Sequence, residues 1–240
     1  MDKEAVLAKL AWFIDSPDLA TIPEEVPPRV NVPESWLNIL RQDLGAKRDA
    51  VLDGWRGFDA NVPSAAHFVR TRLQDVLILL QRDSPSLLYV YTADKGDINF
   101  FEGHLPLQET VPKEFSAVWQ SVPQDLRRFY SEAHNGWTFL ASNAMGPLPL
   151  RDWRFLSESQ FDLGPDTIAR MPVDPQQVVT VFHNGAGDYL CLNFADCNEN
   201  GIASGLVYWH EKPTEPDFVD FWPAMNTWLS IFLENADPYP

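Results

Sequence analysis

Cysteine is scarce in this 240-residue sequence, which contains only Cys191 and Cys197. Two cysteines cannot build the disulfide framework on which small secreted domains depend, so we expect free thiols in a reducing compartment. Long apolar runs are also missing, because no stretch approaches the roughly 18 uninterrupted apolar residues of a membrane-spanning helix. The first residues lack the basic segment and apolar run of a signal peptide. These absences predict a cytoplasmic protein.

Basic residues are the second shortage: 18 lysines and arginines stand against 34 acidic residues, for a net charge of −16. The imbalance is strongest in residues 181–240, where nine acidic side chains face one basic side chain, Lys212, so that this quarter carries −8 of the −16. Such a field repels nucleic acid and anionic membranes and attracts basic surfaces. We therefore expect neither nucleic acid nor membrane as a partner. The same charge also favours solubility, so it does not by itself define a binding surface.

Core-forming residues are plentiful. Hydrophobic residues make up 45% of the chain and aromatic residues 12%, with nine tryptophans, and disordered chains lack such material. The length suits one large domain or two small ones. We expect an α+β domain over residues 64–240. Residues 1–63 are expected to form a helical, proline-rich N-terminal extension packed onto it, because no Gly/Ser linker separates the two.

Helical spacing dominates the first third of the chain. It predicts a helix over residues 3–15 and a second that opens with an Asn31/Glu34 capping box and closes at Gly45. A third helix is predicted from the N-cap Ser64 to Arg82. The period then changes, since residues 87–92 and 98–101 are short apolar and aromatic runs around a turn at 94–97. This pattern indicates a β-hairpin.

The second half reads as a helix followed by strands. A helix begins at Ser121 and ends at Asn135-Gly136, while residues 142–176 are predicted to be irregular. Strands are expected over residues 137–141, 178–182, 189–194 and 206–210, followed by an acidic segment at 211–220 and a last helix at 223–234. Helices followed by an antiparallel meander and a closing helix predict the α+β class, with an antiparallel sheet flanked by helices.

Catalytic and metal-binding motifs are incomplete wherever they begin. His210-Glu211 opens like a zinc-protease motif, but no second histidine follows at the required spacing. The loop that starts at Asp196 resembles a calcium loop, yet its twelfth position is Val207, where a bidentate glutamate is required. The isolated histidines, among them His104, are best interpreted as helix, loop or turn residues. We therefore predict no enzyme, no metal and no cofactor.

Two segments resemble a known family. Residues 122–137 read VPQDLRRFYSEAHNGW, and residues 178–233 contain three strands, a glycine turn and the closing helix FWPAMNTWLSIFL. In this order, over about residues 122–234, they resemble the SUKH superfamily, which includes fungal cell-wall regulators and bacterial immunity proteins. The resemblance implies a SUKH-like domain within residues 64–240 and binding in place of catalysis.

The leading hypothesis from this resemblance is an immunity protein that binds a cognate bacterial toxin and blocks its active site. If the toxin is a nuclease, its basic substrate groove would complement the acidic chain. The alternative is a cytosolic scaffold or regulator of the same fold that binds a host protein. A toxin gene immediately upstream would favour immunity. A deep pocket with converging carboxylates would instead favour an enzyme.

The meander predicts where a partner would bind. In a simple meander the Asn184–Asp188 turn lies at one end of the sheet, and the chain after His210 emerges beside it. Clustered like charges cost stability, so a surface that retains them can serve a partner, although a merely solvated rim is the alternative. We name this surface the acidic rim; its residues are Asp188, Glu211, Glu215, Asp217 and Asp220.

Overall fold

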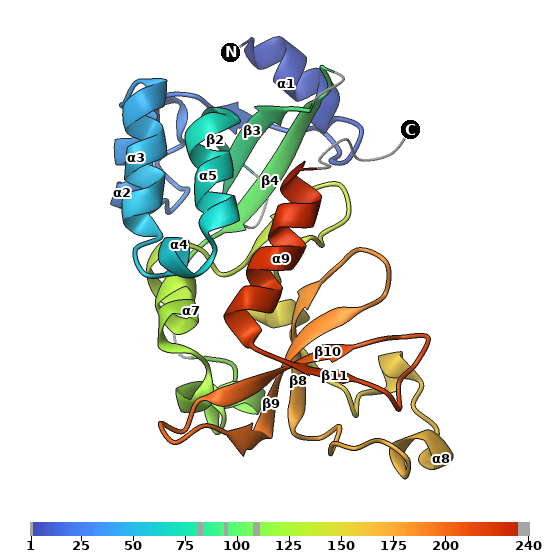
Figure 1. Cartoon of the computed structure of the whole chain (residues 1–240). Coiled ribbons are helices and arrows are strands. Elements are labelled where there is room, and N and C mark those ends of the chain that lie inside the picture. The colour runs from blue at the N-terminus through green and yellow to red at the C-terminus, as the bar shows by residue number, and fades with distance from the viewer. Residues whose placement is uncertain (1, 81–83, 94–95, 108–110, 235–240) are drawn as a thin grey trace.

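The computed structural model describes residues 2–80, 84–93, 96–107 and 111–234, which form two antiparallel sheets surrounded by helices (Figure 1). The α+β class is thus confirmed, with two sheets where the sequence suggested one. The five-stranded sheet has the order β1-β2-β3-β4-β5. Its strands are β1 (Leu19–Ala20), β2 (Leu73–Leu79), β3 (Ser86–Thr92), β4 (Ile98–His104) and β5 (Trp137–Phe139).

The six-stranded sheet contains the C-terminal meander. Its order is β11-β10-β9-β8-β6, and β7 also pairs with β8. The predicted strands at 178–182, 189–194 and 206–210 are confirmed as neighbours. The strands are β6 (Gly146–Pro147), β7 (Arg154–Phe155), β8 (Val178–His183), β9 (Tyr189–Cys197), β10 (Ala203–Tyr208) and β11 (Asp217–Val219).

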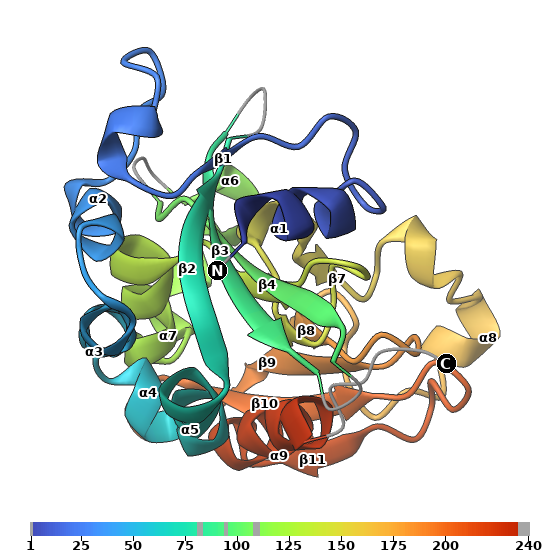
Figure 2. The ribbon, with the colours of Figure 1, turned by 90° about the horizontal axis from the view of Figure 1, so that it is seen from above.

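Helices cover both faces of the five-stranded sheet. α2, α3 and α5 pack on one face and α1 on the other, while α9 contacts α5 as well as β9 and β10 (Figure 2). The helices are α1 (Lys3–Leu10), α2 (Glu34–Leu40), α3 (Leu44–Gly54), α4 (Phe58–Asn61), α5 (Pro63–Thr71), α6 (Lys113–Ser116), α7 (Gln124–Arg128), α8 (Pro165–Ile168) and α9 (Phe221–Glu234). A π-helical turn, Phe129–Ala133, continues α7.

The main hydrophobic core is shared between the first 63 residues and the rest of the chain. Trp36, Trp55 and Phe58 are buried in the same cluster as Trp137 of the five-stranded sheet and Phe182 of the six-stranded sheet. β1 also pairs with β2, which adds a strand from the N-terminal segment to the sheet. The N-terminal segment is therefore part of the core as well as a helical extension.

The predicted helix over residues 64–82 is wrong in its second half. α5 begins after Val62 with Pro63 in its first turn and ends at Thr71, and β2 follows. The spacing of Phe68, Val69 and Leu73 fits a helix, but residues 76–79 are buried on both faces between α1 and the main core. A strand buried on both faces has a continuous apolar sequence. Such a sequence also satisfies the apolar spacing of a helix, so periodicity alone could not tell the two apart.

Two predicted helix boundaries in the N-terminal segment are also wrong. α1 ends at Leu10 and not at residue 15. The N-cap of α2 is Pro33, with no side-chain cap, so the Asn31/Glu34 capping box does not form. Gly45 lies inside α3, whose N-cap Asp43 accepts the N–H of Ala46 at 3.0 Å. The sequence suggested one helix here. The structure has two, α2 and α3, and the Asp43 carboxylate caps the start of the second.

Other predicted elements agree with the structure to within a few residues. The hairpin is β3–β4, although residues 94–95 of its turn lie outside the described residues. The helix expected from Ser121 starts at Gln124, and the strand expected over 137–141 ends at Phe139. The acidic segment 211–220 contains β11, which was not predicted from the sequence. Within the described ranges, no helix is both long and apolar enough to cross a bilayer.

The two thiols should leave stability insensitive to reductant. Cys191 is buried and Cys197 is exposed, and both are free on β9. β9 bulges between them, and their partners on β10, Leu206 for Cys191 and Ala203 for Cys197, are three residues apart. The two Cα atoms are therefore separated by about 10 Å along the sheet, whereas a disulfide needs about 4.4–6.8 Å. We expect the melting temperature, followed by circular dichroism, to be the same with and without dithiothreitol. A fall of several degrees with reductant would contradict this arrangement.

Candidate functional site

The turn between β8 and β9 meets the end of β10, as the meander predicted. The backbone N–H of His210 donates to Oδ1 of Asp188 at 3.1 Å, and Nδ1 of the same histidine lies 2.8 Å from that oxygen. Nδ2 of Asn184 donates to the other carboxylate oxygen at 2.8 Å. Burial opposes ionisation of Asp188, but the bonds from His210 and Asn184 outweigh it and lower the pKa of this carboxyl. Asp188 therefore fixes the position of His210, where the segment after β10 begins.

Three residues of the acidic rim follow β10 and are exposed: Glu211, Glu215 and Asp217. The backbone turns after β10, since the N–H of Glu215 donates to the carbonyl of Lys212 at 3.0 Å. The chain then returns as β11, with Asp217 opposite Val207. The indole N–H of Trp209 donates to Oδ2 of Asp217 at 2.8 Å. The turn thus places these carboxylates at the same end of the sheet as Asp188.

Asp220 lies farther from this group than predicted. It follows β11, whose Val219 pairs with Gly205, and its carbonyl accepts the N–H of Ala224 in the first turn of α9. Three extended residues separate it from Asp217 by about 10 Å. The acidic rim is therefore elongated along β11, with Asp220 exposed at its far end.

An exposed aromatic side chain lies within the acidic rim. Phe218 is 59% exposed and stands on β11 between Asp217 and Val219. β11 is the edge of the six-stranded sheet, and edge strands carry unpaired backbone groups that proteins usually shield with charge. Phe218 was not predicted as a site residue, although a lone aromatic residue in an acidic run was a visible signal in the sequence.

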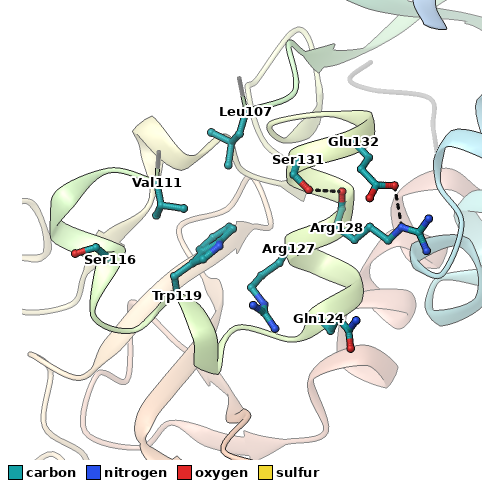
Figure 3. A pocket seen from close by; sticks show the side chains of 9 residues that line it. All are labelled: Leu107, Val111, Ser116, Trp119, Gln124, Arg127, Arg128, Ser131 and Glu132. Carbon is teal, nitrogen blue, oxygen red and sulfur yellow. Dashed lines mark hydrogen bonds and ion pairs between the residues drawn. The ribbon is translucent and has the colours of Figure 1, made fainter. Parts of the chain in front are cut away.

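A pocket of about 810 Å³ lies beside α7 and the π-helical turn (Figure 3). Trp119 and Arg127 face each other across it, and Arg128 turns back toward Glu132. Nε of Arg128 pairs with Glu132 at 2.8 Å, and Arg127 donates to the carbonyl of Val122 at 3.1 Å. Both cations are thus paired within the protein.

Metal-binding geometry is likewise not assembled: in the part of the chain that the structure describes, no three His, Cys, Asp or Glu side chains converge. Comparison with protein-family models, with curated proteins and with solved structures finds no match for this chain. The acidic rim with Phe218 is our candidate binding site.

Proposed function

We propose that this chain is a non-catalytic immunity protein that binds a cognate bacterial toxin with a basic surface and blocks its active site. The observation that carries the proposal is the exposed Phe218 on an edge strand, flanked by Asp217 and followed by Asp220. Protein interfaces combine an aromatic anchor, which loses water on binding, with a charged periphery that sets orientation. The acidic rim has this composition.

The charge of the last quarter of the chain supports a basic partner. Nine acidic side chains against Lys212 give this region a net charge of −8. A field of one sign raises the rate of encounter with an oppositely charged surface and disfavours wrong partners. A nuclease toxin would present such a surface in its substrate groove. The resemblance to SUKH immunity proteins favours a toxin over a host protein as the target.

Reversing charge in the acidic rim should slow association. In the variant Glu215→Lys, Asp217→Lys, Asp220→Lys, we expect the association rate with the toxin encoded beside this chain's gene to fall at least about tenfold at low salt, because electrostatic steering is lost. Stopped-flow fluorescence measures the rate, and circular dichroism checks that the fold persists. The wild-type rate should also fall steeply between about 20 and 150 mM salt, since the Debye length shortens.

A matched control separates a located surface from bulk charge. Glu24, Asp49 and Glu114 are exposed acids away from the acidic rim, and their reversal to lysine changes the net charge equally. This triple variant should keep a rate close to that of the wild type. Equal slowing by both triple variants would mean that no located patch binds the partner. Failure of the wild-type chain to protect cells that produce the toxin would reject immunity and favour the scaffold alternative.

A further inference from the structure

A second pocket, of about 670 Å³, lies on the α1 side of the five-stranded sheet. The segment after α1 forms one wall with Phe13, while Leu80 and Leu140 contribute further apolar surface. α1 and the acidic rim on β11 lie far apart in both views (Figures 1 and 2). The pocket is therefore independent of the proposed toxin-binding surface.

A buried carboxylate lines this pocket. Glu102 and His104 are two residues apart on β4, so both side chains point to the same face of the sheet. The Glu102 side chain is only 6% exposed, and Nδ1 of His104, at 3.7 Å, is its one ion-pair partner among the described residues. Thr138, directly across from Glu102 on β5, has a buried hydroxyl with no hydrogen-bond partner within the same described part. Buried carboxylates are costly unless they are paired and hydrogen-bonded.

His104 does not supply the missing positive charge. Burial lowers the pKa of this imidazole; the Glu102 charge opposes that effect, Arg151 adds to it, and Asp152 opposes it. His104 is therefore neutral near pH 7. Arg151 also lines the pocket, but its side chain is largely exposed and its Nε lies 3.7 Å from Oδ2 of Asp152. Among the described residues, the Glu102 carboxylate thus has no charged cation as an ion-pair partner.

We propose that this pocket binds a small organic cation, with a protonated amine or guanidinium head against Glu102 and an apolar chain along Phe13, Leu80 and Leu140. The ammonium or guanidinium donates hydrogen bonds to the buried carboxylate, which such groups recognise strongly. The apolar wall removes the attached chain from water. This arrangement gives the buried acid the partner that the described side chains do not provide.

The experiment uses n-butylamine and n-butylguanidinium as probes and 1-pentanol as their neutral counterpart. Two-dimensional NMR titration of the full chain should show saturable binding of both cations, at least tenfold tighter than that of the alcohol. Glu102→Gln should weaken binding of the cations at least tenfold. The control Glu132→Gln, an exposed carboxylate on the π-helical turn, changes the charge equally and should have no effect. An equal loss of cation affinity in both variants would mean that the net charge of the chain, and not Glu102, determines binding, and this would overturn the proposal.

A measurement on the wild-type chain covers the case in which Glu102→Gln does not fold. Nuclear Overhauser contacts from the butyl protons should reach the methyl groups of Leu80 and Leu140. Contacts at any other place would overturn the proposal. Binding of lysine-containing peptides without binding of butylamine would also overturn it, because the pocket would then accept only the side chain of a protein partner.

Discussion

Replacement of Gly136 by alanine is expected to lower the free energy of unfolding by about 4 kcal/mol, which for this length is a fall in melting temperature of about 10 °C. Gly136 has φ +91, a conformation that costs other residues about 1–3 kcal/mol. An added Cβ would also lie 2.4 Å from the backbone nitrogen of Pro149 and 2.8 Å from the carbonyl carbon of Leu148. Both neighbours are backbone atoms, which cannot move aside as a flexible side chain can.

Gly54→Ala is the matched control. Gly54 lies at the end of α3, has no positive φ, and has no atom within 4 Å of the place that an added Cβ would take. Alanine should therefore stabilise the chain by up to about 1 kcal/mol, since it restricts the unfolded state and favours the helix. Urea unfolding of both variants measures the two effects. A loss below about 1 kcal/mol for Gly136→Ala would show that the chain at Pro149 is not packed against this turn.

The Asn135-Gly136 turn shows what local sequence can predict. Its residue types suit a left-handed conformation, and Gly136 adopts one. The approach of Pro149 could not be predicted, because residues 142–176 carry no clear periodicity and their path depends on tertiary contacts. Asn135 Oδ1 accepts the N–H of Leu150 at 3.0 Å, and the N–H of Leu148 donates to the carbonyl of Val181 at 2.8 Å. These long-range bonds position the segment.

In the candidate sites, too, some features follow from local sequence and others depend on tertiary contacts. The prediction that the chain after His210 emerges beside the Asn184–Asp188 turn followed from strand lengths and turns, which are local properties of a meander. β11 was missed because a run of three residues, in which only Phe218 and Val219 favour strands, is too short to show an alternating pattern, and it is the pairing with β10 that makes it a strand. Glu102 was missed because the predicted strand stopped at Phe101, whereas β4 continues to His104. Its pairing with β3 over the full length carries the charged residues into the sheet.

His134 illustrates a polar residue that the fold buries by long-range packing. Its ring contacts Trp36 and Phe129, with centroid distances of 5.6 and 5.7 Å. The hydroxyl of Tyr89 lies 2.5 Å from Nε2. Gly103 makes room for the ring, since a Cβ there would lie 2.4 Å from Nδ1. This enclosure lowers the pKa of His134 from 6.5 to about 3, chiefly because burial disfavours the charged imidazolium.

The buried imidazole predicts acid sensitivity at mild pH. Between pH 6.5 and about 3 the unfolded chain binds a proton at His134 that the folded chain does not, so stability falls as pH falls. Well above pH 6.5 neither state binds this proton and the loss is absent, whereas lowering the pH from 7 to 5 should remove about 2 kcal/mol of unfolding free energy. Burial also lowers the pKa values of His104 and His183, which add to the wild-type loss.

The variant His134→Asn isolates the contribution of this one group. It should be less stable than the wild type at pH 7, because the bond with Tyr89 and the packing of the ring are lost. Its further loss between pH 7 and pH 5 should be about 2 kcal/mol smaller, because the titrating group has been removed. Urea unfolding at the two pH values gives both quantities. An identical loss in the variant and the wild type would mean that His134 takes up its proton in the folded state, which the closed packing around the ring does not allow.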